Sequence, residues 1–223
     1  MSLNPLPAPP SDIDQRRIAL VEFCDLLYRT HGINRNPRTS GNSGANRFDA
    51  PDGSYKVLYL GGDPFCAFIE TFAHAAGTRA VTTNSLKIKA LSQLKPVRPL
   101  RLIDLTESGC LFRIGADARL FAADYGVSQL WSKALHDHPV KAQGLLHQSR
   151  LDPSRRSVAL FGDRDPGMVE SERVCWYATG VQRKLLAEIT EHYQIELIES
   201  HNVAPRKPVA SEHDEIQERF PLV

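Results

Sequence analysis

The chain contains 223 residues, of which 42% are hydrophobic and 24% charged, proportions typical of one globular domain. Its 27 Lys and Arg side chains balance 26 Asp and Glu side chains, giving a formal net charge of +1. This balance argues against a protein built around a general basic field, as most non-specific nucleic-acid binders are, and leaves room only for a local basic patch.

Cysteine usage and the apolar runs exclude further classes. The four cysteines are more than 40 residues apart at every step and form no C-x-x-C pair, so a structural zinc site is not indicated. No N-terminal segment has the pattern of a signal peptide, and the apolar runs fall short of the ~20 residues that cross a bilayer. We therefore expect a soluble, reduced, cytoplasmic protein without membrane contact.

Proline-rich and polar stretches mark both ends of the chain. Residues 1–10 contain four prolines, and residues 204–223 are polar with three more. Such segments are usually poorly ordered or used for contacts. We therefore divide the chain into a Pro-rich arm at 1–12, one domain at 13–203 and a polar tail at 204–223.

The first predicted element is a helix. Ser11 and Asp14 resemble an N-cap pair, and the apolar positions that follow have roughly helical spacing, so the helix is expected to end near residues 28–32. Residues 34–54 are polar and contain several glycines, which predicts a loop. A loop of this length in a compact domain is usually functional or disordered.

A strand and a second helix follow this loop. Residues 55–60 are rich in β-forming side chains and precede two glycines, which predicts a strand. Asp63 and Pro64 are a good N-cap followed by proline at the first helical position. Phenylalanines on one stripe then predict a helix over 64–76.

The rest of the chain reads as short strands scattered among helices. Strands are predicted at 86–88, 100–105, 157–161 and 195–198. Helices are predicted at 116–125, 129–136 and 180–193, with a break at Gly126. This order is not a clean βαβ alternation, so we predict a single α+β domain with mixed β-sheets and flanking helices rather than a doubly wound sheet.

The familiar local motifs of catalysis are missing from the sequence. It has no Walker-type phosphate loop, no Gly-rich dinucleotide fingerprint and no nucleophile elbow. His136, Asp137 and His138 could offer two nitrogens to a metal, but no third ligand is nearby. The alternative interpretation is a solvated helix end before Pro139.

Two charged residues could hold or process a ligand. Arg47 lies among small residues that let the backbone approach a ligand closely, and arginine suits a bidentate grip on phosphate. The alternative is a solvated loop arginine. Glu70 falls at the edge of the apolar stripe of its helix, where partial desolvation would suit it to a ribose hydroxyl or a developing cation. The alternative is an ordinary boundary glutamate.

Two uncharged residues are further candidates. Tyr59 ends the strand predicted at 55–60, where it either stacks on a ligand ring or fills the core. Ser149 is flanked by potential hydrogen-bond formers and precedes a turn. Taken alone, it reads as a turn serine.

Together and in this order, these pieces resemble the RES domain family, which is named for an arginine, a glutamate and a serine. The family pattern has Tyr-Arg, a Gly-x-x-Arg-aromatic loop, a strand ending in Leu-Tyr, a helical Glu, and a late Ser-Arg before a strand ending in Leu-Phe. Here these features are Tyr28 and Arg29, residues 44–48, Leu58 and Tyr59, Glu70 eleven residues later, Ser149 and Arg150, and Leu160 and Phe161. The resemblance covers about residues 22–163.

The sequence also departs from the family pattern. The loop between Arg29 and Arg47 is long and polar, and Phe48 stands where Trp is common. His147 and Gln148 replace what is often an aromatic residue and a small or polar one. These departures bear on substrate affinity and turnover more than on the fold.

The resemblance implies a fold similar to that of ADP-ribosyltransferases, NAD⁺ as substrate and no metal. Family members break the nicotinamide–ribose bond. Glu70 would then stabilise the oxocarbenium-like ribose, and Arg29 and Arg47 would clamp the diphosphate. Tyr59 would pack against nicotinamide, and Ser149 would hydrogen-bond an amide, ribose or phosphate oxygen.

The acceptor of the ribosyl group stays open at this point. Phosphate or water would make the protein an NAD⁺-depleting phosphorylase or glycohydrolase that acts as a toxin, whereas a protein side chain would make it an ADP-ribosyltransferase. A third alternative is a non-enzymatic RES-like interaction module. The family also implies a small partner antitoxin with a helix-turn-helix DNA-binding part, so any contact with DNA is expected to belong to that partner.

Overall fold

A large sheet forms the centre of the molecule, in a computed structural model that describes residues 5–73, 77 and 79–199. Its strands are β1 (Leu20–Phe23), β2 (Leu27–Gly32), β3 (Val57–Gly61), β5 (Lys89–Pro96), β6 (Leu100–Asp104), β7 (Gly144–Gln148), β8 (Arg156–Phe161) and β9 (Met168–Cys175). They lie in the order β1-β6-β7-β8-β3-β2-β5-β9, and every neighbouring pair is antiparallel except β6 and β7. A separate parallel pair joins β4 (Ala80–Thr82) to β10 (Glu196–Ile198).

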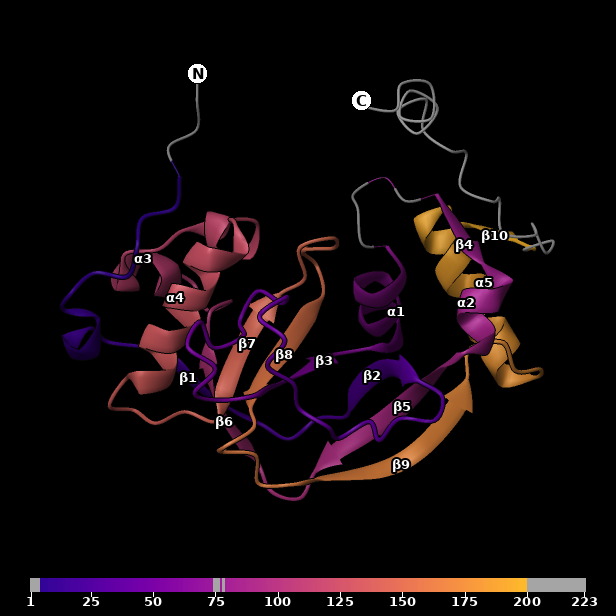
Figure 1. Cartoon of the computed structure of the whole chain (residues 1–223), viewed down its shortest axis with the longest axis horizontal. Helices are drawn as coiled ribbons and strands as arrows, with labels where there is room; N and C mark the ends of the chain where they lie inside the picture. The colour runs from indigo at the N-terminus through magenta and orange to yellow at the C-terminus, as the bar shows by residue number, and fades with distance from the viewer. Residues whose placement is uncertain (1–4, 74–76, 78, 200–223) are drawn as a thin grey trace, which may run out of the picture.

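Helices cover the sheet in two groups. Their bounds are α1 (Pro64–Phe72), α2 (Thr83–Lys87), α3 (Cys110–Ile114), α4 (Tyr125–Asp137) and α5 (Val181–Tyr193), with 3₁₀ turns η1 (Ile13–Gln15) and η2 (Ala118–Phe121). Figure 1 shows a curled sheet, with α3 and α4 at one end, α2, α5 and the β4–β10 pair at the other, and α1 between them. The predicted single α+β domain with a mixed sheet and flanking helices is confirmed.

The curl allows one face of the sheet to pack against itself. Side chains alternate between faces along each strand, and one face carries a core cluster contributed entirely by strand residues: Leu27, Leu58, Leu60, Leu94, Leu100, Leu102, Leu146, Val158, Leu160 and Met168. The opposite face packs against the helices. There Val57, Ala159 and Phe161 meet the α4 side, and Leu91 meets α1 and α5.

The helix predicted near the N-terminus is wrong. Only η1 is helical there, and the chain then runs as β1 and β2. Leu20 lies opposite Ile103 of β6, and Leu27 lies opposite Leu94 of β5. Pairing with strands far along the chain therefore outweighs the local helical spacing.

Two further predictions need correction. Residues 86–88 do not form a strand: Leu86 lies in α2, whose N-cap Thr82 accepts a hydrogen bond from the Ser85 amide, and the strand begins at Lys89. The helix predicted at 116–125 with a break at Gly126 is also wrong: only the 3₁₀ turn η2 forms there before Tyr125, and α4 begins at Tyr125 and runs through Gly126 without interruption.

Other elements agree with prediction. α1 begins at Pro64 with the Asp63 carboxylate accepting from the Cys66 amide at 2.8 Å. It ends at Phe72, and residues 74–76 of the predicted helix lie outside the described residues. The strands predicted at 100–105, 157–161 and 195–198 and the helix at 180–193 match β6, β8, β10 and α5.

The described part of the N-terminal arm lies against the domain. Leu6 is buried, and the indole of Trp131 on α4 donates to the Pro7 carbonyl at 2.8 Å. Among residues 5–73, 77 and 79–199, no helix is both long and apolar enough to span a lipid bilayer.

Candidate active site

A pocket of about 520 Å³ opens on the helix-covered face of the sheet. Its walls come from β2, β3, β7, α1, the loop at 41–48 and the start of α4. Four of the five predicted site residues line it: Arg29, Arg47, Tyr59 and Glu70. The fifth, Ser149, is buried directly behind Glu70. The structure therefore brings all five to one place.

Glu70 and Ser149 form the central pair. The Ser149 hydroxyl donates to Glu70 Oε1 at 2.5 Å. Glu70 projects from α1 and is exposed, so the partial desolvation predicted for it is wrong. Ser149 follows β7 and is only 1% exposed. The pair combines a carboxylate open to the pocket with a buried hydroxyl that orients it.

Backbone amides fix the direction of this hydrogen bond. The Ser149 oxygen accepts from the amides of Leu151 at 3.2 Å and Asp152 at 3.1 Å. A hydroxyl oxygen has two acceptor positions, and both are used here. Its single proton is therefore left for Glu70, and Ser149 acts as a donor to the carboxylate rather than as a nucleophile.

Arg29 is held by the long polar loop that follows its strand. It lies on β2, and its Nη1 donates to the carbonyls of Pro37 at 2.6 Å and Thr39 at 2.8 Å. Burial, with a smaller contribution from Arg35, lowers the pKa of Arg29, but an arginine stays charged in proteins. A fixed positive charge thus lines one side of the pocket.

Arg47 extends from its loop to the start of α4. Its Nη1 donates to the Ala123 carbonyl at 2.6 Å and to the Ser128 hydroxyl at 3.2 Å, and its guanidinium lies 5.1 Å from the centre of the Tyr125 ring. Burial lowers the pKa of Arg47, whereas Tyr125 and Glu70 act to raise it. These contacts fix the guanidinium at the pocket wall.

Tyr59 connects the sheet to the Arg47 loop. Its hydroxyl donates to Asp49 at 2.9 Å and accepts from the Phe48 amide at 3.0 Å. Burial and the adjacent Asp49 raise the pKa of Tyr59, so the phenol is neutral. The Asp49 carboxylate, itself fully buried, also accepts from the Asn46 amide at 3.2 Å. The tyrosine therefore both lines the pocket and orders the loop.

The same loop is anchored on α4 from behind. The Ser132 hydroxyl donates to the Phe48 carbonyl at 2.7 Å, and the Tyr55 hydroxyl lies 2.7 Å from the Ser132 hydroxyl. Gln129, one turn earlier, donates to the Gly44 carbonyl at 2.8 Å. The backbone on both sides of Arg47 is therefore fixed by a rigid helix.

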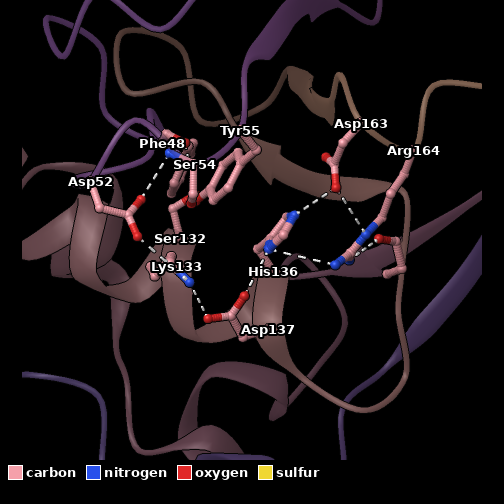
Figure 2. Close-up of polar contacts among 11 residues, drawn as sticks. Phe48, Asp52, Ser54, Tyr55, Ser132, Lys133, His136, Asp137, Asp163 and Arg164 are labelled. Atoms are coloured by element: carbon pink, nitrogen blue, oxygen red, sulfur yellow. Dashed lines mark hydrogen bonds and ion pairs between the residues drawn. The ribbon is translucent and has the colours of Figure 1, made fainter.

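The two histidines considered for metal binding serve other contacts. His136 stacks on Tyr55 with ring centres 4.0 Å apart and lies between Asp137 and Asp163 (Figure 2). His138 is buried and accepts from the Val140 amide. Within the part of the chain that the structure describes, no three His, Cys, Asp or Glu side chains gather as a metal site would require.

Sequence reasoning did not select two pocket residues. His147 lies on β7 and contacts the rings of Phe48 and Phe121, and burial lowers the pKa of this imidazole. Its Nε2 is buried without a hydrogen-bond partner among the described residues. Arg150, next to Ser149, also lines the pocket. Recognition of residues 144–148 as a strand would have indicated that His147 shares a face with Leu145 in the core.

The charges of the pocket favour an anion. Three arginines line it against one carboxylate, a balance of +2 among these groups: Arg29, Arg47 and Arg150 against Glu70. Guanidinium groups recognise phosphate and carboxylate through paired hydrogen bonds. A volume of about 520 Å³ lies in the usual range of small-molecule sites. Fold and site together define an α+β domain with a pocket whose size and charge suit an anionic small molecule.

Comparison with known proteins identifies the family. The RES domain profile matches residues 26–184, so the chain belongs to the RES domain family. A chain in the crystal structure of the M. tuberculosis MbcT–MbcA toxin–antitoxin complex has the same fold, with a TM-score of 0.58 and 19% sequence identity over 80% of this chain and 98% of that one. No curated protein sequence matches the chain significantly.

Proposed function

We propose that this protein is a toxin-type enzyme that cleaves the nicotinamide–ribose bond of NAD⁺. The observation that carries the proposal is the Glu70–Ser149 pair, which faces a pocket lined by three arginines. NAD⁺ combines a diphosphate, which needs cationic partners, with a ribose that becomes positively charged as nicotinamide leaves. A pocket with guanidinium groups and one oriented carboxylate meets both needs.

The proposed mechanism gives each group a separate task. Arg29 and Arg47 bind the diphosphate, and Tyr59 lies against the nicotinamide ring. As the glycosidic bond breaks, its electron pair goes to the nicotinamide nitrogen and positive charge develops on the ribose. Glu70 stabilises that charge because its carboxylate is held in place by the Ser149 proton. An oxygen of phosphate or water then bonds to the ribose carbon, and water releases a proton to solvent as it does so.

The test is nicotinamide release from NAD⁺ by the purified full-length chain, with and without phosphate. We expect Glu70→Gln to lower kcat by about 10²–10³-fold, since it removes the charge that meets the transition state. Glu188→Gln, at an exposed glutamate of α5, is the matched control and should retain full activity. Dependence on phosphate would identify phosphorolysis, and release in its absence would identify hydrolysis.

Other outcomes would overturn this proposal. Undiminished release by Glu70→Gln would exclude the mechanism. No release by the unaltered chain would favour the alternatives, which are transfer of ADP-ribose to a protein or a non-enzymatic interaction module. Labelling of a bacterial lysate by isotopic NAD⁺ would separate these two, because only a transferase leaves label on protein.

The proposal includes a partner antitoxin with a helix-turn-helix DNA-binding part. It rests on membership of the RES domain family and on the toxin–antitoxin complex that contains the similar fold. The near-neutral charge of this chain is consistent with DNA contacts made by the partner alone. Co-expression with the product of the neighbouring gene should yield a co-purifying complex, and failure to associate would contradict this part of the proposal.

A further inference from the structure

The turn that carries Ser149 depends on one arginine. Residues 149–155 leave β7 and return as β8, and the Ser149 amide donates to the Arg155 carbonyl at 2.9 Å. The Arg155 amide in turn donates to the Asp152 carbonyl at 2.9 Å. The backbone of Arg155 therefore closes the turn whose conformation directs the Ser149 proton at Glu70.

The Arg155 side chain ties this turn to the helix that carries Glu70. Its Nη1 donates to Asp63 at 2.8 Å, and its Nε lies 3.0 Å from Asp152. Asp63 is the N-cap of α1, so one carboxylate holds both the first turn of that helix and the guanidinium. The guanidinium also lies over the Phe65 ring, 4.3 Å from its centre. Arg155 thus sets where α1 begins relative to the Ser149 turn.

The cluster of Asp63, Asp152 and Arg155 is completed by a residue outside the RES match. The match ends at residue 184, and Tyr193 lies at the end of α5. Its hydroxyl donates to Asp152 at 2.8 Å and accepts from Arg155 Nε at 2.9 Å. Burial works to raise the pKa of Asp152, but hydrogen bonds from Ser154 and Tyr193 together hold it below its ordinary value. The tyrosine therefore helps keep the Asp152 carboxylate charged beside the guanidinium.

We infer that Arg155 and Tyr193 are positioning residues that hold α1 and the 149–155 turn at the separation the Glu70–Ser149 pair requires. This inference rests on the proposed function of that pair. Neither residue is among those that line the pocket, so both are expected to act through the elements that they hold. The end of α5 therefore helps to position the Glu70–Ser149 pair, although it lies beyond the family match. A shift of about 1 Å between the two elements is enough to lower turnover substantially.

The test uses full-length variants that keep the packing volume. Tyr193→Phe removes only the hydroxyl, and Arg155→Lys keeps the charge but cannot bind two carboxylates in the fixed geometry of a guanidinium. We expect kcat for nicotinamide release to fall about tenfold in Arg155→Lys and about threefold in Tyr193→Phe, with KM for NAD⁺ unchanged. Tyr177→Phe and Arg156→Gln, at two exposed positions, are the matched controls and should behave as the unaltered chain.

A second readout does not depend on catalysis. Hydrogen exchange at the Leu151 and Asp152 amides, which bond to the Ser149 oxygen, should accelerate in Arg155→Lys and Tyr193→Phe but not in the controls. If the unaltered chain releases no nicotinamide, the proposed function fails and exchange alone decides whether the cluster holds the turn. Unchanged exchange, or faster exchange with unchanged kcat, would overturn the inference.

Discussion

Glu170 on β9 shows how a charged residue away from the pocket contributes to stability. It binds Arg173 through two hydrogen bonds of 2.6 and 2.7 Å and accepts from the buried Ser92 hydroxyl at 2.6 Å. Ser92 also lies 2.7 Å from His31 in the neighbouring strand. The hydrogen bonds from Arg173, with the single one from Ser92, lower the pKa of Glu170 to about 2.

A carboxyl group whose pKa is lower in the folded than in the unfolded protein stabilises the fold when the pH is above its pKa in the unfolded protein. That contribution is lost as the pH falls toward its pKa in the folded protein. Glu170→Gln should therefore lower the free energy of unfolding by about 1–2 kcal/mol at pH 7, after allowance for screening. The difference should shrink between pH 4.5 and 2. Urea unfolding at pH 7, 4 and 2.5 measures it, with the exposed Glu172→Gln as control. A deficit that is the same at all three pH values would contradict the electrostatic explanation.

At the scale of whole elements, two glycines differ in the space around them. Gly144 lies where two strands pack closely, whereas Gly126 lies on an open helix surface. A side chain at Gly144 on β7 would place its Cβ 2.5 Å from the Ala159 carbonyl oxygen and 2.9 Å from the Leu160 Cα of β8. At Gly126, inside α4, an added Cβ would meet no atom within 4 Å apart from its chain neighbours and the backbone of its own helix.

Alanine should therefore have opposite effects at the two positions. Gly144→Ala forces β7 and β8 apart and should destabilise the fold by about 3 kcal/mol. Gly126→Ala lowers the backbone entropy of the unfolded chain and introduces no clash in α4, so it should stabilise the fold by about 0.5–1 kcal/mol. Thermal unfolding monitored by circular dichroism compares them, and a stabilising Gly144→Ala would refute the close approach of the two strands.

Elements that begin with a clear capping residue or a proline could be predicted from the sequence. Strands that pair with strands far along the chain could not. Asp63 and Pro64 mark the start of α1 because capping and proline geometry act within a single turn. β1 and β2 pair with β6 and β5, which lie more than 50 residues further along the chain. Those partners are absent from any local window, so the segment reads as a helix.

The candidate site was predicted better than the elements around it. Arg29, Arg47, Tyr59, Glu70 and Ser149 meet at one pocket, although Arg29 was expected on a helix end and lies on a strand. Their order in the sequence carried that prediction. Other contributions could not be predicted: those of His147, of Arg150, and of the cluster that Arg155 forms with Asp63, Asp152 and Tyr193. They depend on how β7, β8 and α5 pack together, which the spacing of residues along the sequence does not reveal.

At the scale of the whole molecule, the described part of the N-terminal arm, residues 5–12, contributes to the core. Leu6 is 5% exposed and packs in the cluster that contains Trp131 and Phe161. Leu6→Ala should destabilise the protein by about 2 kcal/mol, since it leaves a cavity beside a fully buried indole. Urea unfolding followed by tryptophan fluorescence measures this change. Substitution of the exposed Val181 by alanine is the control, and equal effects at both positions would contradict a role for the arm in the core.

The position of Tyr193 has a consequence for synthesis of the chain. Ribosomes extend a protein from its N-terminus, and a domain folds as a unit once enough of it has emerged. Arg29, Arg47, Glu70 and Ser149 are all made before Tyr193, the last residue of α5. A nascent chain that already contains every pocket residue still lacks the hydroxyl that joins Asp152 to Arg155. The order of translation thus delays completion of the site until nearly the whole domain has been made.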